Sequence, residues 1–329
     1  MKITAYDAGA SVVGLMADGH WHSGPELARV LGVTRATVSA RIAGLSERGV
    51  DVYSVSGKGY RLAQPLDLLN ADVLAAGLDA STYTMLDELL ICEQVASTND
   101  IVASFEDGAT RACLAEHQSA GRGRAGRVWV SPYAANLYLS VARVLDAPKG
   151  PLGALSLAVG VALADALTTL GVPDVGLKWP NDLWIGQAKV GGILIEHRGE
   201  AGGAARLIVG VGLNVAMNSA QSAAIDQAFT QIADHAPALP TRTTLAATCI
   251  NAVLGALAEF SQAGFVGFAQ RWPHYDRVAG RPIRLLETRG ERSGIARGIN
   301  ADGSLSVEMD GSRHAIYSGD VSLRLGSSA

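Results

Sequence analysis

The stretch GRGRAGR, residues 121–127, decides how this chain is interpreted, because three arginines and three glycines occupy seven successive positions. Arginine forks bind anionic oxygens, and glycines let the backbone fold closely around a ligand. The glycines also satisfy the GxGxxG pattern of dinucleotide-binding folds, which requires a helix directly after it. Here Pro132 follows shortly, and Leu137, Leu139 and Val141 then alternate as in a strand. These features exclude a dinucleotide-binding fold.

An ordinary solvated loop is the alternative interpretation of residues 121–127. Arg122, Arg124 and Arg127 have no acidic neighbour in the sequence and repel one another, so a plain surface turn gains nothing from them. An anion that completes the loop accounts for both the charges and the glycines. We therefore predict a loop that closes over an anionic ligand.

The composition is that of a folded soluble protein, with 329 residues, 48% hydrophobic and 18% charged side chains and a net charge of −4. The length allows two or three domains, and the charge argues against a protein that coats nucleic acid. Cys92, Cys113 and Cys249 are far apart, which favours reduced core thiols over disulfides or a zinc site. The seven histidines show no metal-ligand spacing. We expect no tightly bound metal.

The longest apolar stretch, residues 152–172, is long enough to span a membrane. It contains Ser156, Asp165 and threonines, so we interpret it as a buried core helix. A secretory signal would open with a basic region followed by an apolar one, and no such pattern is present. We expect a cytoplasmic protein with no membrane partner.

Residues 1–64 have the pattern of a winged helix-turn-helix. A short helix is expected over residues 12–17, and the capping box SGPE at residues 23–26 opens a second helix. Thr34 caps a third helix, whose apolar side chains recur at helical spacing until Gly49 ends it. The glycine-rich stretch SGKGYRL then predicts a hairpin that forms the wing.

Such a unit places one helix in the major groove of DNA, while the wing contacts the backbone. The first 62 residues carry seven Lys and Arg against five Asp and Glu. A small helical packing or dimerisation module is the alternative, but arginines on the expected recognition helix favour DNA. The residues expected to contact DNA are Arg35, Thr37, Ser39, Arg41 and Lys58.

Pro65 begins a boundary to a central domain, residues 65–278, in which helices and strands are mixed. Strands are expected at residues 112–115, 137–141, 193–196 and 207–211. A glycine-rich segment joins the last two, which predicts antiparallel neighbours, and a helix over residues 245–260 follows. Residues 279–329 predict a small β-barrel, because Gly and Asp turns separate short strands at residues 283–286, 293–299, 304–308 and 321–323.

Four further motifs accompany the arginine loop: STND at residues 97–100, KWPND at 178–182, KVGGILIE at 189–196 and GVGLNV at 210–215. Each has an ordinary interpretation alone. Ser97 could cap a helix, Gly210 and Gly212 could mark a β-bulge, and Trp179-Pro180 could form a packed turn. With GRGRAGR they make a set of five motifs in a fixed order.

The set resembles the biotin protein ligases that also act as repressors of the biotin operon, and the likeness covers about the entire chain. GRGRxGR with a preceding Gln118, KWPND, KxxGILxE and GxGxN in this order are not shared, as a set, with lipoate ligases. The chain departs from the closely related repressor-ligases at Ala125, where they have arginine. This departure concerns the loop and the dimer rather than the reaction.

The resemblance implies an α+β fold with an N-terminal winged helix-turn-helix, a central mixed α/β domain of the biotin/lipoate ligase type and a C-terminal small SH3-like β-barrel. It implies that biotin and MgATP give biotinoyl-AMP, and that a lysine of a biotin carboxyl carrier domain of acetyl-CoA carboxylase then displaces AMP. It further implies repression of biotin synthesis genes at operator DNA by a homodimer that forms when the adenylate is bound.

The resemblance also assigns residues. Catalysis is expected from Arg122, Arg124, Lys189 and Asp182, since cations must offset the charge that develops between the carboxylate and the phosphate. Biotin binding is expected at Ser97, Thr98, Asn99, Gln118, Gly121, Arg122, Gly123, Arg124 and Lys189. ATP binding is expected at Arg124, Trp129, Lys178, Asn181, Asp182, Lys189, Gly212 and Asn214.

Two of these residues carry more specific expectations. The flat face of Trp129 suits adenine, although a core tryptophan is the alternative without the resemblance. Asp182 offers oxygen ligands for Mg²⁺, and it is also expected to orient or deprotonate the acceptor lysine.

Two other functions remain as alternatives. A ligand-sensing repressor without transfer activity would have lost Lys189 or the loop arginines, which this chain retains. A lipoate-type ligase would lack GRGRxGR.

Overall fold

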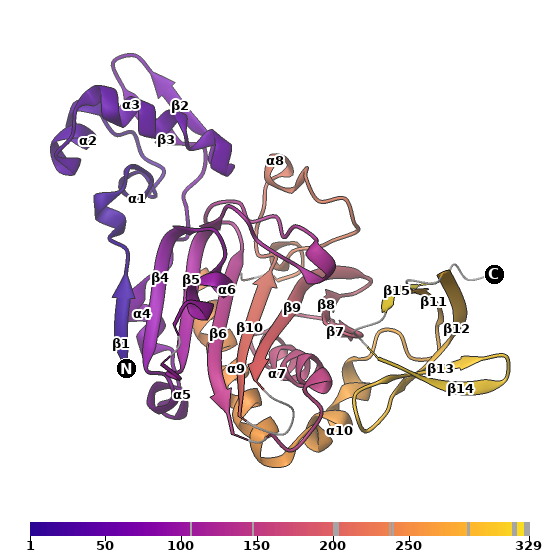
Figure 1. Cartoon of the computed structure of the whole chain (residues 1–329). Helices are drawn as coiled ribbons and strands as arrows, with labels where there is room; N and C mark the ends of the chain where they lie inside the picture. The colour runs from indigo at the N-terminus through magenta and orange to yellow at the C-terminus, as the bar shows by residue number, and fades with distance from the viewer. Residues whose placement is uncertain are drawn as a thin grey trace.

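The computed structural model describes residues 1–105, 107–146, 148–199, 204–236, 238, 240–287, 290–317 and 321–325. The chain forms an N-terminal helical unit, a central eight-stranded sheet with helices on both faces, and a C-terminal five-stranded sheet (Figure 1). The predicted α+β class and the predicted order of the three units are confirmed.

The N-terminal unit contains three helices and a hairpin: α1 (Val12–Leu15), α2 (Gly24–Leu31), α3 (Arg35–Ala43), β2 (Val52–Val55) and β3 (Gly59–Leu62). Ser23 and Thr34 cap α2 and α3 as predicted, because their hydroxyl oxygens accept backbone N–H groups of the first turns. The hairpin is the wing expected from SGKGYRL. A helix-turn-helix with a wing is therefore present.

Helix α3 ends at Ala43 and does not reach Gly49. The predicted apolar stripe of Val38, Ile42 and Leu45 is buried, but Leu45 lies beyond the helix, before a 3₁₀ turn at Ser46–Arg48. Gly49 has a φ of 76°, a left-handed conformation that glycine adopts without strain, and it ends this turn. The helical spacing of apolar residues therefore extends beyond the end of the helix.

The central sheet has the strand order β1-β4-β5-β6-β10-β9-β8-β7. Its strands are β1 (Lys2–Ala5), β4 (Glu88–Val95), β5 (Arg111–Gln118), β6 (Leu137–Leu145), β7 (Val175–Lys178), β8 (Asp182–Ile185), β9 (Ala188–Gly199) and β10 (Ala205–Leu213). Strands β1, β4 and β5 are parallel, and the remaining neighbours are antiparallel. The expected antiparallel pairing of β9 and β10 is confirmed, while residues 200–203 of their connection lie outside the described residues.

Helices cover both faces of this sheet. α7 (Leu155–Thr169) and α9 (Arg242–Ala263) share one large core with it, while α6 (Thr98–Ala103) packs on the other face. The remaining helices are α4 (Ala71–Ala76), α5 (Ala80–Met85), α8 (Ser219–Ser222) and α10 (Val266–Tyr275). Among the described residues, two helical segments, Leu152–Thr169 and Arg242–Ala263, are long and apolar enough to cross a membrane, but 56% and 61% of their most apolar 18-residue windows are buried inside the protein. The predicted core helix is confirmed.

The first strand lies outside the unit to which the sequence assigned it. Residues 2–5 fell within the expected DNA-binding range of 1–64, yet β1 pairs in parallel with β4 at the edge of the central sheet. Four residues with the sequence KITA are too short a pattern to show which sheet they join. The N-terminal unit is thus connected to the central sheet through both of its ends (Figure 1).

A buried ion pair joins these two connections. Arg242 donates from Nη1 to Oε2 of Glu116 at 2.6 Å, and the side chains are 3% and 0% exposed. The other carboxylate oxygen, Oε1, accepts the hydroxyl of Tyr6 at 2.9 Å and the backbone N–H of Leu69 at 2.8 Å. Tyr6 precedes the N-terminal unit and Leu69 follows it, so one carboxylate fixes both ends.

The C-terminal sheet has the order β14-β13-β12-β11-β15. Its strands are β11 (Pro282–Glu287), β12 (Gly290–Ile299), β13 (Leu305–Met309), β14 (Ser312–Ile316) and β15 (Val321–Leu325). Strand β14 was not predicted, because its alternating pattern is weak and most of its residues are exposed. The indole of Trp179 donates to the carbonyl of Gly303 at 3.1 Å, which attaches this sheet to the central domain.

Replacing Arg242 with methionine should lower the free energy of unfolding by about 3–5 kcal/mol, because Glu116 would stay buried without its cation. Urea unfolding measures the change. Arg297→Met is the matched control, since its pair with Glu308 is partly exposed and should cost less than about 1 kcal/mol. Similar small changes in both variants would contradict a structural role for the buried pair.

Candidate functional site

A cavity of about 610 Å³ opens where β9, β10, α6 and the arginine loop meet. This volume lies in the range of roughly 300–1,000 Å³ that is usual for small-molecule sites. Most of the predicted binding residues line it: Ser97, Thr98, Asn99, Gln118, Arg122, Gly123, Arg124, Trp129, Asn181, Lys189, Gly212 and Asn214. Motifs that are far apart in the sequence therefore form one site.

Small polar side chains are fixed to one another at one end of the cavity. Gln118 accepts from the backbone N–H of Thr98 at 2.9 Å, and the hydroxyl oxygens of Thr98 and Ser140 lie 2.7 Å apart. Ser140 in turn donates to Oδ1 of Asn99 at 2.5 Å. Ser97 stands at the N-cap position of α6 but its side chain makes no capping bond, so the simple capping interpretation is wrong.

Glycines on β10 create the space for this arrangement. A Cβ atom at Gly210 would lie 2.5 Å from Oδ1 of Asn99, and one at Gly212 would lie 2.5 Å from the Trp129 ring. Strand β10 keeps a regular register with both neighbours, so these glycines do not mark a bulge. They let α6 and Trp129 lie directly against the strand.

Cations gather at the other end of the cavity. Nζ of Lys189 lies 2.7 Å from Oδ1 of Asp182 and 5.6 Å from the centre of the Trp129 ring. Arg124 donates to Oδ1 of Asn181 at 3.2 Å. Burial lowers the pKa of Arg124, and the negative charge of Asp182 opposes that shift. An ammonium, a guanidinium and an indole face thus converge, as anionic and aromatic ligand groups require.

The arginine loop is a tight turn at the cavity mouth. The backbone N–H of Trp129 donates to the carbonyl of Gly121 at 2.9 Å, and that of Gly123 donates to the carbonyl of Arg127 at 2.7 Å. Ala125 and Gly126 at the tip have φ values of 54° and 71°. The alanine side chain is exposed in this left-handed conformation. The departure at Ala125 therefore removes a charge from an exposed position of the loop.

Arg122 turns toward α6. It donates to both carboxylate oxygens of Asp100, at 2.7 Å from Nη1 and 2.6 Å from Nη2, and Oε1 of Glu196 lies 3.7 Å away. The guanidinium hydrogen bonds hold the pKa of Asp100 below its usual range, so this pair persists until acid reaches that lowered pKa. The predicted role of Arg122 in catalysis and biotin binding stays a prediction, and in this structure its guanidinium pairs with carboxylates.

Three predicted ligand-binding residues do not line the cavity wall. Gly121 is buried behind the loop, where an added Cβ would lie 2.6 Å from the carbonyl oxygen of Trp129. Lys178 is 8% exposed, and its Nζ lies 5.2 Å from the ring centre of Trp184. Asp182 reaches the site through its contact with Lys189. Their ligand contacts remain predictions.

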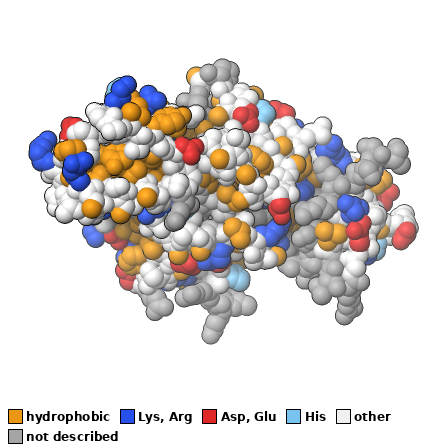
Figure 2. Space-filling model, turned by 90° about the horizontal axis from the view of Figure 1, so that it is seen from above, with side chains coloured by type: hydrophobic (Ala, Val, Ile, Leu, Met, Phe, Trp, Pro, Cys, Tyr) orange, Lys and Arg blue, Asp and Glu red, His pale blue; other side chains and the backbone are white. Residues whose placement is uncertain are grey.

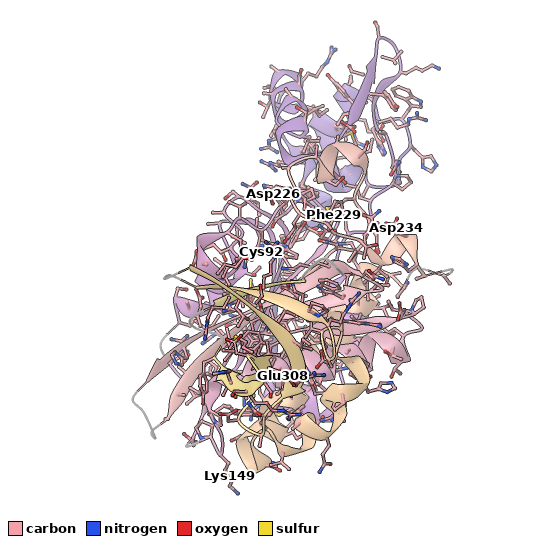
Figure 3. All side chains as sticks on the ribbon, turned by 90° about the vertical axis from the view of Figure 1, so that its right-hand side faces the viewer. Cys92, Lys149, Asp226, Phe229, Asp234 and Glu308 are labelled. Atoms are coloured by element: carbon pink, nitrogen blue, oxygen red, sulfur yellow. The ribbon has the colours of Figure 1, made fainter. Side chains whose placement is uncertain are left out.

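Residues 224–227 and Phe229 also line the cavity, although the sequence analysis did not single them out. Asn214 holds the end of this segment, since its Nδ2 donates to the carbonyl of Thr230 at 3.1 Å. Figure 3 shows Asp226 and Phe229 just below the N-terminal unit. Residues 224–229, with the sequence AIDQAF, contain no motif that could have revealed this role.

The donor atoms near Asp182 do not make a resident metal site. Asp182 supplies one carboxylate, and its Oδ1 already contacts an ammonium group. Among the described residues, no group of three or more His, Cys, Asp or Glu side chains could hold a metal ion. Magnesium would therefore depend on ligands supplied by a phosphate-bearing substrate.

The predicted DNA-contacting side chains lie on the outer surface of the N-terminal unit. Arg35, Ser39, Arg41 and Lys58 are exposed, and Thr37 is partly buried beside Thr34. Lys58 and Arg61 both lie near the ring of Trp21, whose centre is 5.9 Å from Nζ of Lys58 and 5.2 Å from Cζ of Arg61. Figure 2 shows Lys and Arg side chains at the left-hand end, over this unit.

Comparisons with known proteins cover each part of the chain. Residues 91–214 match the Biotin/lipoate A/B protein ligase family, residues 15–61 match an HTH domain, and residues 278–324 match the Biotin protein ligase C terminal domain. The Bifunctional ligase/repressor BirA of Escherichia coli (strain K12) is 39% identical over 95% of this chain and 96% of its own length. The chain belongs to the BirA family of bifunctional ligase/repressors.

Two other relatives match a large part of this chain. A Biotin--[acetyl-CoA-carboxylase] ligase of Mycobacterium tuberculosis is 34% identical over 79% of this chain and 97% of its own length. The structure of a biotin protein ligase from Aquifex aeolicus in complex with biotin and ATP superposes with a TM-score of 0.63 at 26% identity. It covers 73% of this chain and 100% of the Aquifex chain.

Replacing Gly212 with alanine should displace Trp129 from β10, because the new Cβ would lie 2.5 Å from the ring. We expect the Trp129 fluorescence, obtained by subtracting the spectrum of matched Trp129→Phe variants, to shift toward that of exposed indole. Overpacking should also cost about 1–3 kcal/mol of stability. Gly153→Ala is the control, since a Cβ there meets nothing within 4 Å. An unchanged Trp129 spectrum would contradict this packing.

Proposed function

We propose that this chain makes biotinoyl-5′-AMP from biotin and ATP and transfers the biotin to a lysine of a biotin carboxyl carrier domain, and that it represses transcription when the adenylate is bound. The cavity carries this proposal. One of its ends presents fixed small polar groups, and the other combines Lys189, Arg124 and the Trp129 face. This difference between the two ends matches an acyl-adenylate, which has a compact ureido ring at one end and a nucleotide at the other.

The polar end fits the ring of biotin. Its ureido group both donates and accepts hydrogen bonds, and Ser97, Thr98, Asn99 and Gln118 supply the same mixture of groups. Their mutual hydrogen bonds fix them before a ligand arrives, which lowers the entropic cost of binding.

In the first step an oxygen of the biotin carboxylate attacks the α-phosphorus of ATP, and pyrophosphate leaves. Both reacting groups are anionic, so their approach requires fixed positive charge. Lys189 is proposed to lie between the two reacting anions, and Asp182 holds its ammonium at 2.7 Å. Arg124, fixed by Asn181, adds a second cation on the loop side.

In the second step the amine of the acceptor lysine attacks the acyl carbon, AMP leaves and the amine loses a proton. Asp182 is the carboxylate proposed to orient or deprotonate this amine. Its contact with Lys189 supports a first role in positioning the ammonium. Residues 121–127 close the mouth and keep water from the mixed anhydride between the two steps.

Magnesium is proposed to enter with ATP, where it would neutralise charge on the phosphate oxygens. Asp182 and Asn181 are the oxygen-bearing side chains that would be near it. Trp129 is proposed to support the adenine, since its aromatic ring packs closely against β10, where a Cβ added at Gly212 would lie 2.5 Å from it. Gly212 on β10 and Asn214 directly after it would then contact the nucleotide.

The repressor function rests on the N-terminal unit. Arg35, Ser39 and Arg41 lie exposed on α3, and Lys58 lies on the wing, as contact with a DNA groove and backbone requires. Paired half-sites would need a homodimer, which we propose forms when the adenylate is bound. The proposed location of the protein is the cytoplasm, where operator, carrier domain and ATP meet.

The decisive test incubates the purified protein with biotin, MgATP and a biotin carrier domain, and then measures the intact mass of the carrier. We expect one biotin on a single lysine. Lipoate in place of biotin should give no product, which excludes a lipoate-type ligase. Biotin binding without transfer would support a sensor-repressor that lacks ligase activity.

Replacing Lys189 with alanine should reduce adenylate formation by at least about 100-fold, because the cation between the two anions is lost. Release of pyrophosphate measures the first step. Folding should stay intact, since Lys189 lies at the cavity and contributes little to the core, and circular dichroism checks this. Adenylation at the wild-type rate would remove Lys189 from the mechanism.

A gel shift with operator DNA tests the repressor function. Binding should tighten at least about tenfold when isolated biotinoyl-AMP is added, because ligand binding and dimerisation would be linked. Arg35→Ala with Arg41→Ala should abolish the shift while leaving carrier biotinylation intact. An affinity that is indifferent to the adenylate would contradict this form of regulation.

A further inference from the structure

The first arginine of the loop is held differently from the second. Arg124 lies on the cavity side and donates to Asn181, whereas Arg122 forms a two-pronged ion pair with Asp100 on α6. A second carboxylate, that of Glu196 on β9, lies 3.7 Å from the same guanidinium. Two carboxylates beside one guanidinium offset its positive charge, so Arg122 would attract a phosphate only weakly.

Arg122 lies at the base of the loop, so its ion pair can restrain the movement of the loop. Arg122 forms an isolated β-bridge with Val128 at the base of the turn, next to the bond between Gly121 and Trp129. Any opening of residues 123–127 must pivot at this base. A side chain that fastens the base to α6 therefore restrains the whole loop.

Glu196 also contacts the polar end of the cavity. Its Oε2 accepts from Nδ2 of Asn99 at 2.9 Å, while its Oε1 faces Arg122. Asn99 then presents Oδ1 to Ser140, so Glu196 determines how the Asn99 amide is turned. One carboxylate thus connects the loop to the proposed biotin end.

We infer that Asp100 and Glu196 are positioning residues that latch Arg122, hold the loop base against α6 before any ligand binds, and thereby slow the escape of the adenylate. Arg122 acts in this inference as the held part of a latch and not as a cation that faces the reacting phosphate. The inference rests on the proposed function only where it concerns the adenylate, because the restraint of the loop exists without ligand.

Isolated pairs of exposed charges usually contribute little, but this contact has the features of the exceptions. The arginine fork meets both oxygens of one carboxylate, and a further carboxylate extends the pair into a network. The side chains of Arg122 and Asp100 are 38% and 51% exposed, so the latch can open without burying a charge. A contact that is bidentate but partly exposed suits a loop that must admit substrates and then retain an intermediate.

The first experiment follows tryptic cleavage after Arg124 and Arg127 in the full chain without biotin or ATP. The Asp100→Asn and Glu196→Gln variants should be cut at least about fivefold faster than wild type, because the loop base is released. Glu308→Gln is the matched control, since its pair with Arg297 is similarly exposed and lies in the C-terminal sheet. Cleavage of Asp100→Asn at the wild-type rate would overturn the latch.

A charge swap separates a latch from a phosphate ligand. Arg122→Asp should speed cleavage after Arg124 and Arg127, and adding Asp100→Arg should restore at least part of the protection. A cation needed by the phosphate could not be replaced in this way. If the double variant is cut as fast as Arg122→Asp alone, the inference fails.

Substitutions of the two carboxylates should also have different kinetic effects. Asp100→Asn should raise the dissociation rate of biotinoyl-AMP about three- to tenfold with less than a twofold change in the KM for biotin. Glu196→Gln should raise both, because it also releases Asn99. Equal effects on both quantities in the two variants would indicate a general structural role and would overturn the inference. Absence of adenylate in every protein would instead refute the proposed function, while the cleavage results would still decide the latch.

Discussion

The close approach of Asn99 and Trp129 to the bare backbone of β10 is the constraint on which the site depends. A side chain at Gly210 or Gly212 would occupy the space that these residues fill, since each added Cβ would lie 2.5 Å from them. The glycines therefore set the depth of the cavity between the sheet and the elements above it. Asn99 is brought there by α6 and Trp129 by the segment after the arginine loop, so both must fit against one strand.

Sequence analysis identified the parts of the fold that have a strong local pattern. The N-terminal helices, the core helix α7 and the β9–β10 hairpin follow from capping residues, apolar length and alternation, respectively. Strands β1 and β14 were missed or misplaced, because four or five residues carry too little periodicity. The five motifs likewise identified most of the cavity wall, since chemistry at each position limits the residue types.

The remaining parts of the site depend on contacts between distant residues. The pairing of Arg122 with Asp100 joins residues 22 positions apart, and nothing local indicates which carboxylate an arginine will choose. Residues 224–229 reach the cavity through the bond from Asn214 to Thr230, and the buried Glu116–Arg242 pair spans 126 positions. Such contacts are specified by the folded chain as a whole, because each depends on the packing of several strands.

The placement of β1 makes the N-terminal unit an insertion in the central domain. The chain starts as an edge strand of the central sheet, leaves to build the helix-turn-helix, and returns toward β4. Deleting the first 64 residues would therefore strip a strand from the catalytic sheet and expose the hydrogen-bonding edge of β4, which invites pairing between molecules. A shortened form that keeps the edge covered would have to retain residues 1–6 and join them directly to the segment around Leu69. Such a form is an internal deletion rather than an N-terminal truncation.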